Sequence, residues 1–408
     1  MRIAAPVDAV LVAVDPGKAQ HRVWVANQSE GLLEEPLSVP ALRDGVEALA
    51  SLVAKHANGA APLIAVEATG ALHQPFAREL ERRFPGSLRL FAPSETQAAR
   101  TQLGSRRFKT DDRDCAALIY LLRQGEGRPA EDPALDALTA AVRHRRGLVA
   151  QRKVLQQRMH DQLNALCPGL SAPAGHGRAL ALEDSSGQAV LACAVAFAGR
   201  PPSWRSLVAR APGRLYESNA RFWSERWRRL LPPPADAAAR AQRLAGELGR
   251  WQLLQSDIHA VETEIAELLA ATDGQVLTSL PGVATVRAAA FACHSLPLER
   301  FATAERLYSA TGLAPANYQS STITRRGRIS RQGLAEHRDA LMGIAWGLSQ
   351  FSQTFRERDQ ELRARGFQPI QARVALARNA CRLCFRLIET QQPFDEERYR
   401  RARHSRGR

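Results

Sequence analysis

Four carboxylates occupy positions where they could hold divalent metal ions. Asp15 and Glu67 each end a short apolar run, and Asp111 and Asp114 stand three residues apart where a helical pattern begins. Carboxylate oxygens are the ligands that Mg²⁺ prefers, and two such ions can bind the attacking and leaving oxygens of a phosphoryl transfer. The four residues therefore predict a centre with two Mg²⁺ ions that acts on phosphodiester bonds.

The elements around these residues must bring them together. A carboxylate at the end of an apolar strand lies at the rim of an open α/β sheet, where such sheets bind ligands. Thr110 can cap the helix that follows it, and a spacing of three puts Asp111 and Asp114 on one helix face. Taken alone, this aspartate pair is also explained by its favourable interaction with the helix dipole. All four residues can converge on one point in a ribonuclease-H-like sheet, and we expect that fold here.

The charge of the chain favours a polyanionic partner. Lys and Arg number 56 against 41 Asp and Glu, a net charge of +15 with a sequence pI near 10.5. Nucleic acid is the first candidate and an anionic membrane surface a distant second. The composition, 45% hydrophobic and 24% charged, excludes wholesale disorder. We see neither a signal peptide nor an apolar run of membrane-spanning length, and expect a cytoplasmic protein with reduced cysteines.

The organisation of the chain predicts an α/β domain followed by all-α sequence. Apolar residues recur at steps of three and four between Leu244 and Leu268, which indicates a helical hairpin, a coiled-coil seam or one amphipathic helix. We expect an α/β domain at 1–130, a helical and coiled-coil region at 131–272 with a linker near 232–234, a helical domain at 273–399 and a basic tail at 400–408.

The motifs together resemble those of the DEDD transposases of bacterial insertion sequences. The resemblance runs from about residue 10 to 399, and its motifs occur in the family's order. It implies a RuvC-like N-terminal domain that carries the carboxylates and a C-terminal transposase domain that carries a catalytic serine. The matching segments are Asp-x-x-Lys at 15–18, Glu-x-Thr-Gly at 67–70, Lys-Thr-Asp-x-x-Asp at 109–114, Leu-Pro-Gly-Val at 280–283, the segment at 308–315 and the basic segment at 325–329.

The resemblance points to Ser320 as the nucleophile. The family pattern has a Tyr, one variable residue, the Ser and usually a Gly; here Tyr318 is the tyrosine and Ser321 stands at the glycine position. That departure leaves the nucleophile open between the adjacent serines, and without the family Tyr318 would be a rival. A covalent enzyme–DNA link conserves the phosphodiester's energy for rejoining. The sequence accordingly has no GxxxxGK[ST] phosphate loop.

Four arginines follow this segment and are candidates for binding phosphate. A generic basic surface is the alternative interpretation. The resemblance further implies a non-coding guide RNA and a homo-oligomer, a dimer or tetramer, that pairs one chain's carboxylates with another's serine. The expected location is the bacterial cytoplasm, at the nucleoid when DNA is bound. The arginines are Arg325, Arg326, Arg328 and Arg331.

Two other functions remain open at this point. A Mg²⁺-dependent Holliday-junction resolvase or nuclease would use the same carboxylates with water and would not need Ser320. A non-catalytic nucleic-acid-binding protein with a degenerate nuclease fold would need none of them. All four carboxylates are present, which counts against the second alternative.

Overall fold

The computed structural model divides the chain into two compact units, Met1–Asp132 and Pro133–Arg408. We describe each unit by itself. The structure describes residues 9–29, 31–57, 59–70, 72–104, 109–129, 133–171, 179–320 and 323–405, and gives only the backbone of residues 133, 317–320, 323–327 and 403–405.

The first unit contains a six-stranded mixed sheet in the order β3-β2-β1-β4-β5-β6. β1 pairs antiparallel with β2 and parallel with β4, and β5 extends the parallel part. This confirms the predicted ribonuclease-H-like, RuvC-like fold. The strands are β1 (Leu11–Asp15), β2 (Gln20–Ala26), β3 (Leu37–Pro40), β4 (Leu63–Glu67), β5 (Leu88–Phe91) and β6 (Arg128–Pro129).

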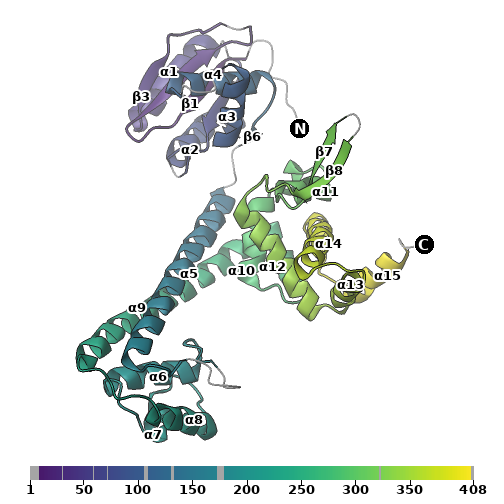
Figure 1. Cartoon of the computed structure of the whole chain (residues 1–408). Helices are drawn as coiled ribbons and strands as arrows, with labels where there is room; N and C mark the ends of the chain where they lie inside the picture. Colours follow the sequence, from purple (N-terminus) through teal and green to yellow (C-terminus); the bar gives the residue numbers. More distant parts are fainter. Residues whose placement is uncertain are drawn as a thin grey trace. The chain divides into compact units, whose positions relative to one another are not determined.

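Helices cover both faces of this sheet, which is why its central strand is apolar on both sides. Val12 and Val14 pack on one face with α1 and α2, and Leu11 and Ala13 pack on the other with α4. α3 in turn packs against α4 (Figure 1). The helices are α1 (Arg43–Ala57), α2 (Gln74–Arg83), α3 (Pro93–Gln102) and α4 (Asp111–Arg123).

Two 34-residue helices, α5 (Pro133–Leu166) and α9 (Ala237–Ala270), dominate the second unit and lie side by side (Figure 1). They run antiparallel, because the start of α5 shares a core with the end of α9 and the end of α5 shares another with the start of α9. The predicted apolar stripe is the buried face of α9, where Leu254 is buried and Leu253 is exposed. A true coiled-coil seam stays a prediction.

Each end of the long helical pair supports a cluster of shorter helices. Near the C-terminal end of α5, the side chains of Trp223 and Trp227 are buried in the hydrophobic core, so these tryptophans have a structural role. The helices there are α6 (Ser185–Ala196), α7 (Trp204–Arg210) and α8 (Glu217–Arg228). At the opposite end are η1 (Asp273–Ser279), α10 (Thr285–Ser295), η2 (Leu298–Arg300), α11 (Ala304–Ala310), α12 (Ala335–Phe351), α13 (Gln353–Ala364), α14 (Pro369–Thr390) and α15 (Glu396–Ser405).

The helical C-terminal region contains a β-hairpin that we did not predict. β7 (Pro315–Ser320) pairs antiparallel with β8 (Ile323–Ile329), with a register irregularity near Asn317. The expected basic tail begins inside α15, where the Tyr399 ring stacks on Phe355. The predicted border at residue 272, within the second unit, stays a prediction. In the described residues, no helix combines the length and apolar character needed to cross a membrane.

Candidate active site

Asp15 and Glu67 end neighbouring parallel strands at the same edge of the sheet. β1 and β4 pair in register, with Val14 opposite Val66, so the residues that follow them lie side by side. Glu67 is buried, and one of its carboxylate oxygens accepts a 2.8 Å hydrogen bond from Thr69 Oγ1. The turn after β4 therefore fixes the orientation of the Glu67 carboxylate through this hydrogen bond.

The start of α4 brings the aspartate pair to the sheet. Thr110 caps the helix as expected, with its side-chain oxygen accepting a hydrogen bond from the Arg113 amide at 3.3 Å. α4 packs against β1 and β4 through its apolar face. Asp114 is consequently on the buried side of α4, whereas Asp111, at the first helical position, is exposed.

The four carboxylates interact electrostatically. Burial and the negative charges of Glu67, Asp114 and Asp111 together raise the pKa of Asp15 to about 7, against the opposing charge of Lys109. Burial likewise raises the pKa of Asp114, with Glu67 and Asp111 acting in the same direction. Asp15 and Asp114 thus lie within electrostatic range of the other carboxylates that we selected from sequence, and their role as a metal site stays a prediction.

Arg100 on α3 is a member of this site that we missed. Its Nε lies 2.9 Å from Asp114 Oδ1, and Lys109 Nζ lies 4.0 Å from Oδ2. Neither oxygen of Asp114 accepts a hydrogen bond, so the contact with Arg100 is electrostatic. Both cations oppose the rise in the pKa of Asp114. No spacing pattern marks Arg100 in the sequence, because it reaches Asp114 through the packing of α3 on α4.

A divalent cation suits this donor set. Buried carboxylate oxygens without hydrogen bonds, beside other carboxylates, are stabilised by a cation and destabilised without one. Within the described residues, no three His, Cys, Asp or Glu side chains are already gathered as a metal site. The residues that would hold the metal are Asp15, Glu67, Asp111 and Asp114.

Asp112, between the paired aspartates, points away from them. It accepts hydrogen bonds from Arg22 Nε at 2.6 Å, Arg22 Nη2 at 3.1 Å and Trp24 Nε1 at 2.9 Å. These bonds lower the pKa of Asp112. Its role is to tie α4 to β2, so it serves as a matched control for the other two aspartates.

The expected serine segment belongs to the second unit, and its backbone forms the hairpin. Ser320 ends β7 opposite Ile323, and Tyr318 pairs with Arg325. Ser321 lies outside the described residues, and the side chains of residues 317–320 and 323–327 are not described. The nucleophile and the roles of Arg325 and Arg326 therefore stay predictions.

The remaining two arginines of the basic segment are exposed. Arg328 lies near the end of β8, and Arg331 follows the strand with a φ of +56°. That left-handed conformation is costly for a residue with a Cβ atom. The Arg331 amide donates a 2.9 Å hydrogen bond to the Gly312 carbonyl, which holds the turn.

Comparison with known proteins finds two matches. Residues 12–168 match the family described as Transposase, the DEDD transposases of IS110 elements, and residues 274–360 match the Transposase IS116/IS110/IS902 family. The first stretch contains all four carboxylates, and the second contains the hairpin with Ser320. No curated protein matches the chain.

Proposed function

Because this chain belongs to the DEDD transposases of the IS110 family, we propose that it cuts and rejoins DNA with a Mg²⁺-binding carboxylate centre and a serine nucleophile. The chain is a transposase, and these families act on DNA. The observation that supports the finer proposal is the electrostatic coupling of Asp15 with Glu67, Asp114 and Asp111 where the parallel strands β1 and β4 end.

In the proposed mechanism, the four carboxylates hold two Mg²⁺ ions. A bound metal ion would supply charge neutralisation at the scissile phosphate and activation of the attacking oxygen. Thr69 holds Glu67 in place, and burial keeps water from competing for Asp114. Arg100 balances the charge of Asp114 and is thus a positioning residue.

Ser320 is proposed to form the covalent link. Its Oγ forms a bond to phosphorus, the hydroxyl proton passes to a base or to solvent, and the DNA hydroxyl leaves. A second DNA hydroxyl then attacks the serine–phosphate bond and releases the serine. One phosphodiester is exchanged for another, so no external energy source is required.

The partners form part of the proposal. A charge of +15 favours DNA, and the arginines of α5 suit a non-coding guide RNA. We propose a homo-oligomer in which one chain's carboxylates act with another chain's Ser320, in the bacterial cytoplasm.

DNA cleavage by single-site variants tests the carboxylate centre. Asp15→Asn, Glu67→Gln, Asp111→Asn and Asp114→Asn should each abolish cleavage while DNA binding persists. Asp112→Asn is the control, because Asp112 binds Arg22 and Trp24 instead. Weakening these contacts should lower the free energy of unfolding by about 1 kcal/mol but leave DNA cleavage measurable. An Asp112→Asn variant as inactive as Asp114→Asn would contradict the assignment.

A further inference from the structure

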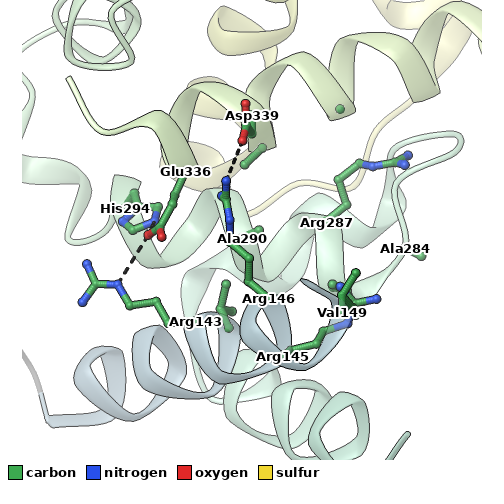
Figure 2. A pocket seen from close by; sticks show the side chains of 14 residues that line it. Arg143, Arg145, Arg146, Val149, Ala284, Arg287, Ala290, His294, Glu336 and Asp339 are labelled. Atoms are coloured by element: carbon green, nitrogen blue, oxygen red, sulfur yellow. Dashed lines mark hydrogen bonds and ion pairs between the residues drawn. The ribbon is translucent and has the colours of Figure 1, made fainter. Parts of the chain in front are cut away.

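A pocket of about 450 Å³ lies between α5, α10 and α12 of the second unit (Figure 2). It shares no residue with the carboxylate site or the serine hairpin. α5 contributes Arg143, Arg145 and Arg146, and α10 contributes Arg287. A concave space of this volume is large enough for a small organic ligand.

The rim of the pocket carries an excess of positive charge. Arg143 Nε lies 3.4 Å from Glu336 Oε2, and Arg146 Nη2 lies 2.9 Å from Asp339 Oδ2 (Figure 2). About half of each arginine side chain is exposed, so these ion pairs contribute little and open readily. Each guanidinium has five N–H donors, and one carboxylate leaves some of them for an anion.

The other two arginines are held at fixed positions. Arg145 Nη2 lies 2.6 Å from Glu262 Oε1 on α9, which fixes its direction. Arg287 Nη1 donates a 2.6 Å hydrogen bond to the Gly282 carbonyl, so its charge has no carboxylate partner in that contact. The four arginines of the lining thus face three carboxylates, Glu336 and Asp339 in the lining and Glu262 beside it, which leaves one positive charge in excess.

The rest of the lining is apolar. Small and β-branched side chains from the three helices form it, and a patch of this kind favours a flat, weakly polar group over a second ion. The lining residues of this type are Val142, Val149, Ala284, Val286, Ala290 and Ala340.

We infer that this pocket binds one unpaired nucleotide of a nucleic-acid strand, with the base on the apolar lining and the phosphate on the arginines. The combination of charged rim and apolar lining matches the two halves of a nucleotide. A base stacked inside a duplex cannot enter, so the pocket selects single-stranded or extruded nucleotides. RNA and DNA strands share this chemistry.

Binding of single strands by the full-length protein tests the inference. The probes are fluorescein-labelled ten-nucleotide uridine RNA, thymidine DNA and the same DNA paired with its complement. Fluorescence anisotropy is measured in EDTA, which keeps binding separate from catalysis. Arg146→Ala removes a rim charge, and Ala284→Trp fills the pocket from an exposed position without changing any charge.

Both variants should weaken binding of single strands about tenfold and of the duplex far less. Arg146→Ala should also reduce the salt slope for single strands by about 0.7. Arg382→Ala is the matched control, because Arg382 on α14 lies outside the pocket, is about half exposed and pairs with Glu305 at 2.7 Å, much as Arg146 pairs with Asp339. Loss of affinity in both pocket variants supports the inference. Whether affinity falls for the RNA probe, the DNA probe or both identifies the kind of strand that the pocket binds.

Two results would overturn the inference. If Ala284→Trp binds single strands as tightly as the unchanged protein, nothing enters the pocket. If Arg382→Ala weakens binding as much as Arg146→Ala, the arginines contribute only diffuse charge. Because this readout needs no metal, its failure is distinguishable from a failure of the proposed catalytic function.

Discussion

The guanidinium of Arg100 lies 2.9 Å from Asp114, whose two carboxylate oxygens are buried and accept no hydrogen bond. A buried carboxylate in this state needs a counter-charge, and Arg100 supplies one from a different helix. A divalent cation bound at the carboxylates would act on the same oxygens. Arg100 and the metal are therefore expected to stabilise the first unit in overlapping ways.

Replacing Arg100 should make folding depend more on metal. Without Mg²⁺, Arg100→Ala should lose about 3 kcal/mol of unfolding free energy, because it leaves Asp114 buried without its partner. Added Mg²⁺ should restore more stability to this variant than to the unchanged protein. Denaturant unfolding with and without Mg²⁺ measures both quantities.

Arg83→Ala is the control for this experiment. Arg83 pairs with Glu47 at 3.6 Å, with both side chains more than half exposed, and its loss should change stability by less than about 0.5 kcal/mol. An identical Mg²⁺ effect in the unchanged protein and in Arg100→Ala would show that Arg100 and the metal do not share Asp114.

A covalent intermediate distinguishes a serine recombinase from an enzyme that uses water. Denaturing gels of a stalled reaction should show protein linked to DNA, and Ser320→Ala should remove that band. If Ser321→Ala removes it instead, the nucleophile is the neighbouring serine. If both variants keep the band, Tyr318→Phe tests the tyrosine. Cleavage with free ends and no adduct would favour the resolvase alternative.

The exposed arginines after the serine segment should contribute to phosphate binding. Arg328→Ala should reduce the salt slope on duplex DNA by about 0.9 for one lost phosphate contact. Arg331→Gly should do the same and also stabilise the fold by up to about 1 kcal/mol, because glycine adopts the positive φ without strain. Anisotropy over a series of salt concentrations, with thermal unfolding, measures both effects. An unchanged slope in both variants would assign these arginines to a generic basic surface.

His337 should make the second unit sensitive to acid. Burial, with the nearby charges of His294 and Arg300, lowers the pKa of His337 from 6.5 to about 3. Its ring nitrogen forms a 3.0 Å hydrogen bond with Ser295 Oγ in the core. Below pH 6.5 His337 is protonated in the unfolded chain but stays neutral in the folded chain. The contribution of neutral His337 to the free energy of unfolding is therefore fully present above pH 6.5 and falls as the pH drops toward 3.

The expected contribution of this residue is at most about 1.4 kcal/mol per pH unit. His337→Gln should lower stability at neutral pH but flatten its decline between pH 6.5 and 4. His259→Gln, at an exposed position of α9, should leave the decline unchanged. Denaturant unfolding at several pH values measures this, and an equal decline in His337→Gln and the unchanged protein would contradict it.

Local patterns in the sequence determined much of the first unit. Apolar runs predicted the strands that end at Asp15 and Glu67, and Thr110 predicted the start of the helix with the aspartate pair. These features depend on residues that are close together in the chain, and a local sequence pattern contains information about such residues only. The short edge strands β3 and β6 escaped prediction because two to four residues carry too little pattern.

Only the tertiary structure decided which groups touch. The pairing of Arg100 with Asp114 requires α3 to pack on α4, and the pocket of arginines requires α5, α10 and α12 to meet. Asp112 and Asp114 are both acidic residues of one helical turn, yet one binds Arg22 at the surface and the other is buried at the carboxylate centre. Burial and counter-charge arise from residues distant in the chain, so no local spacing could have specified them.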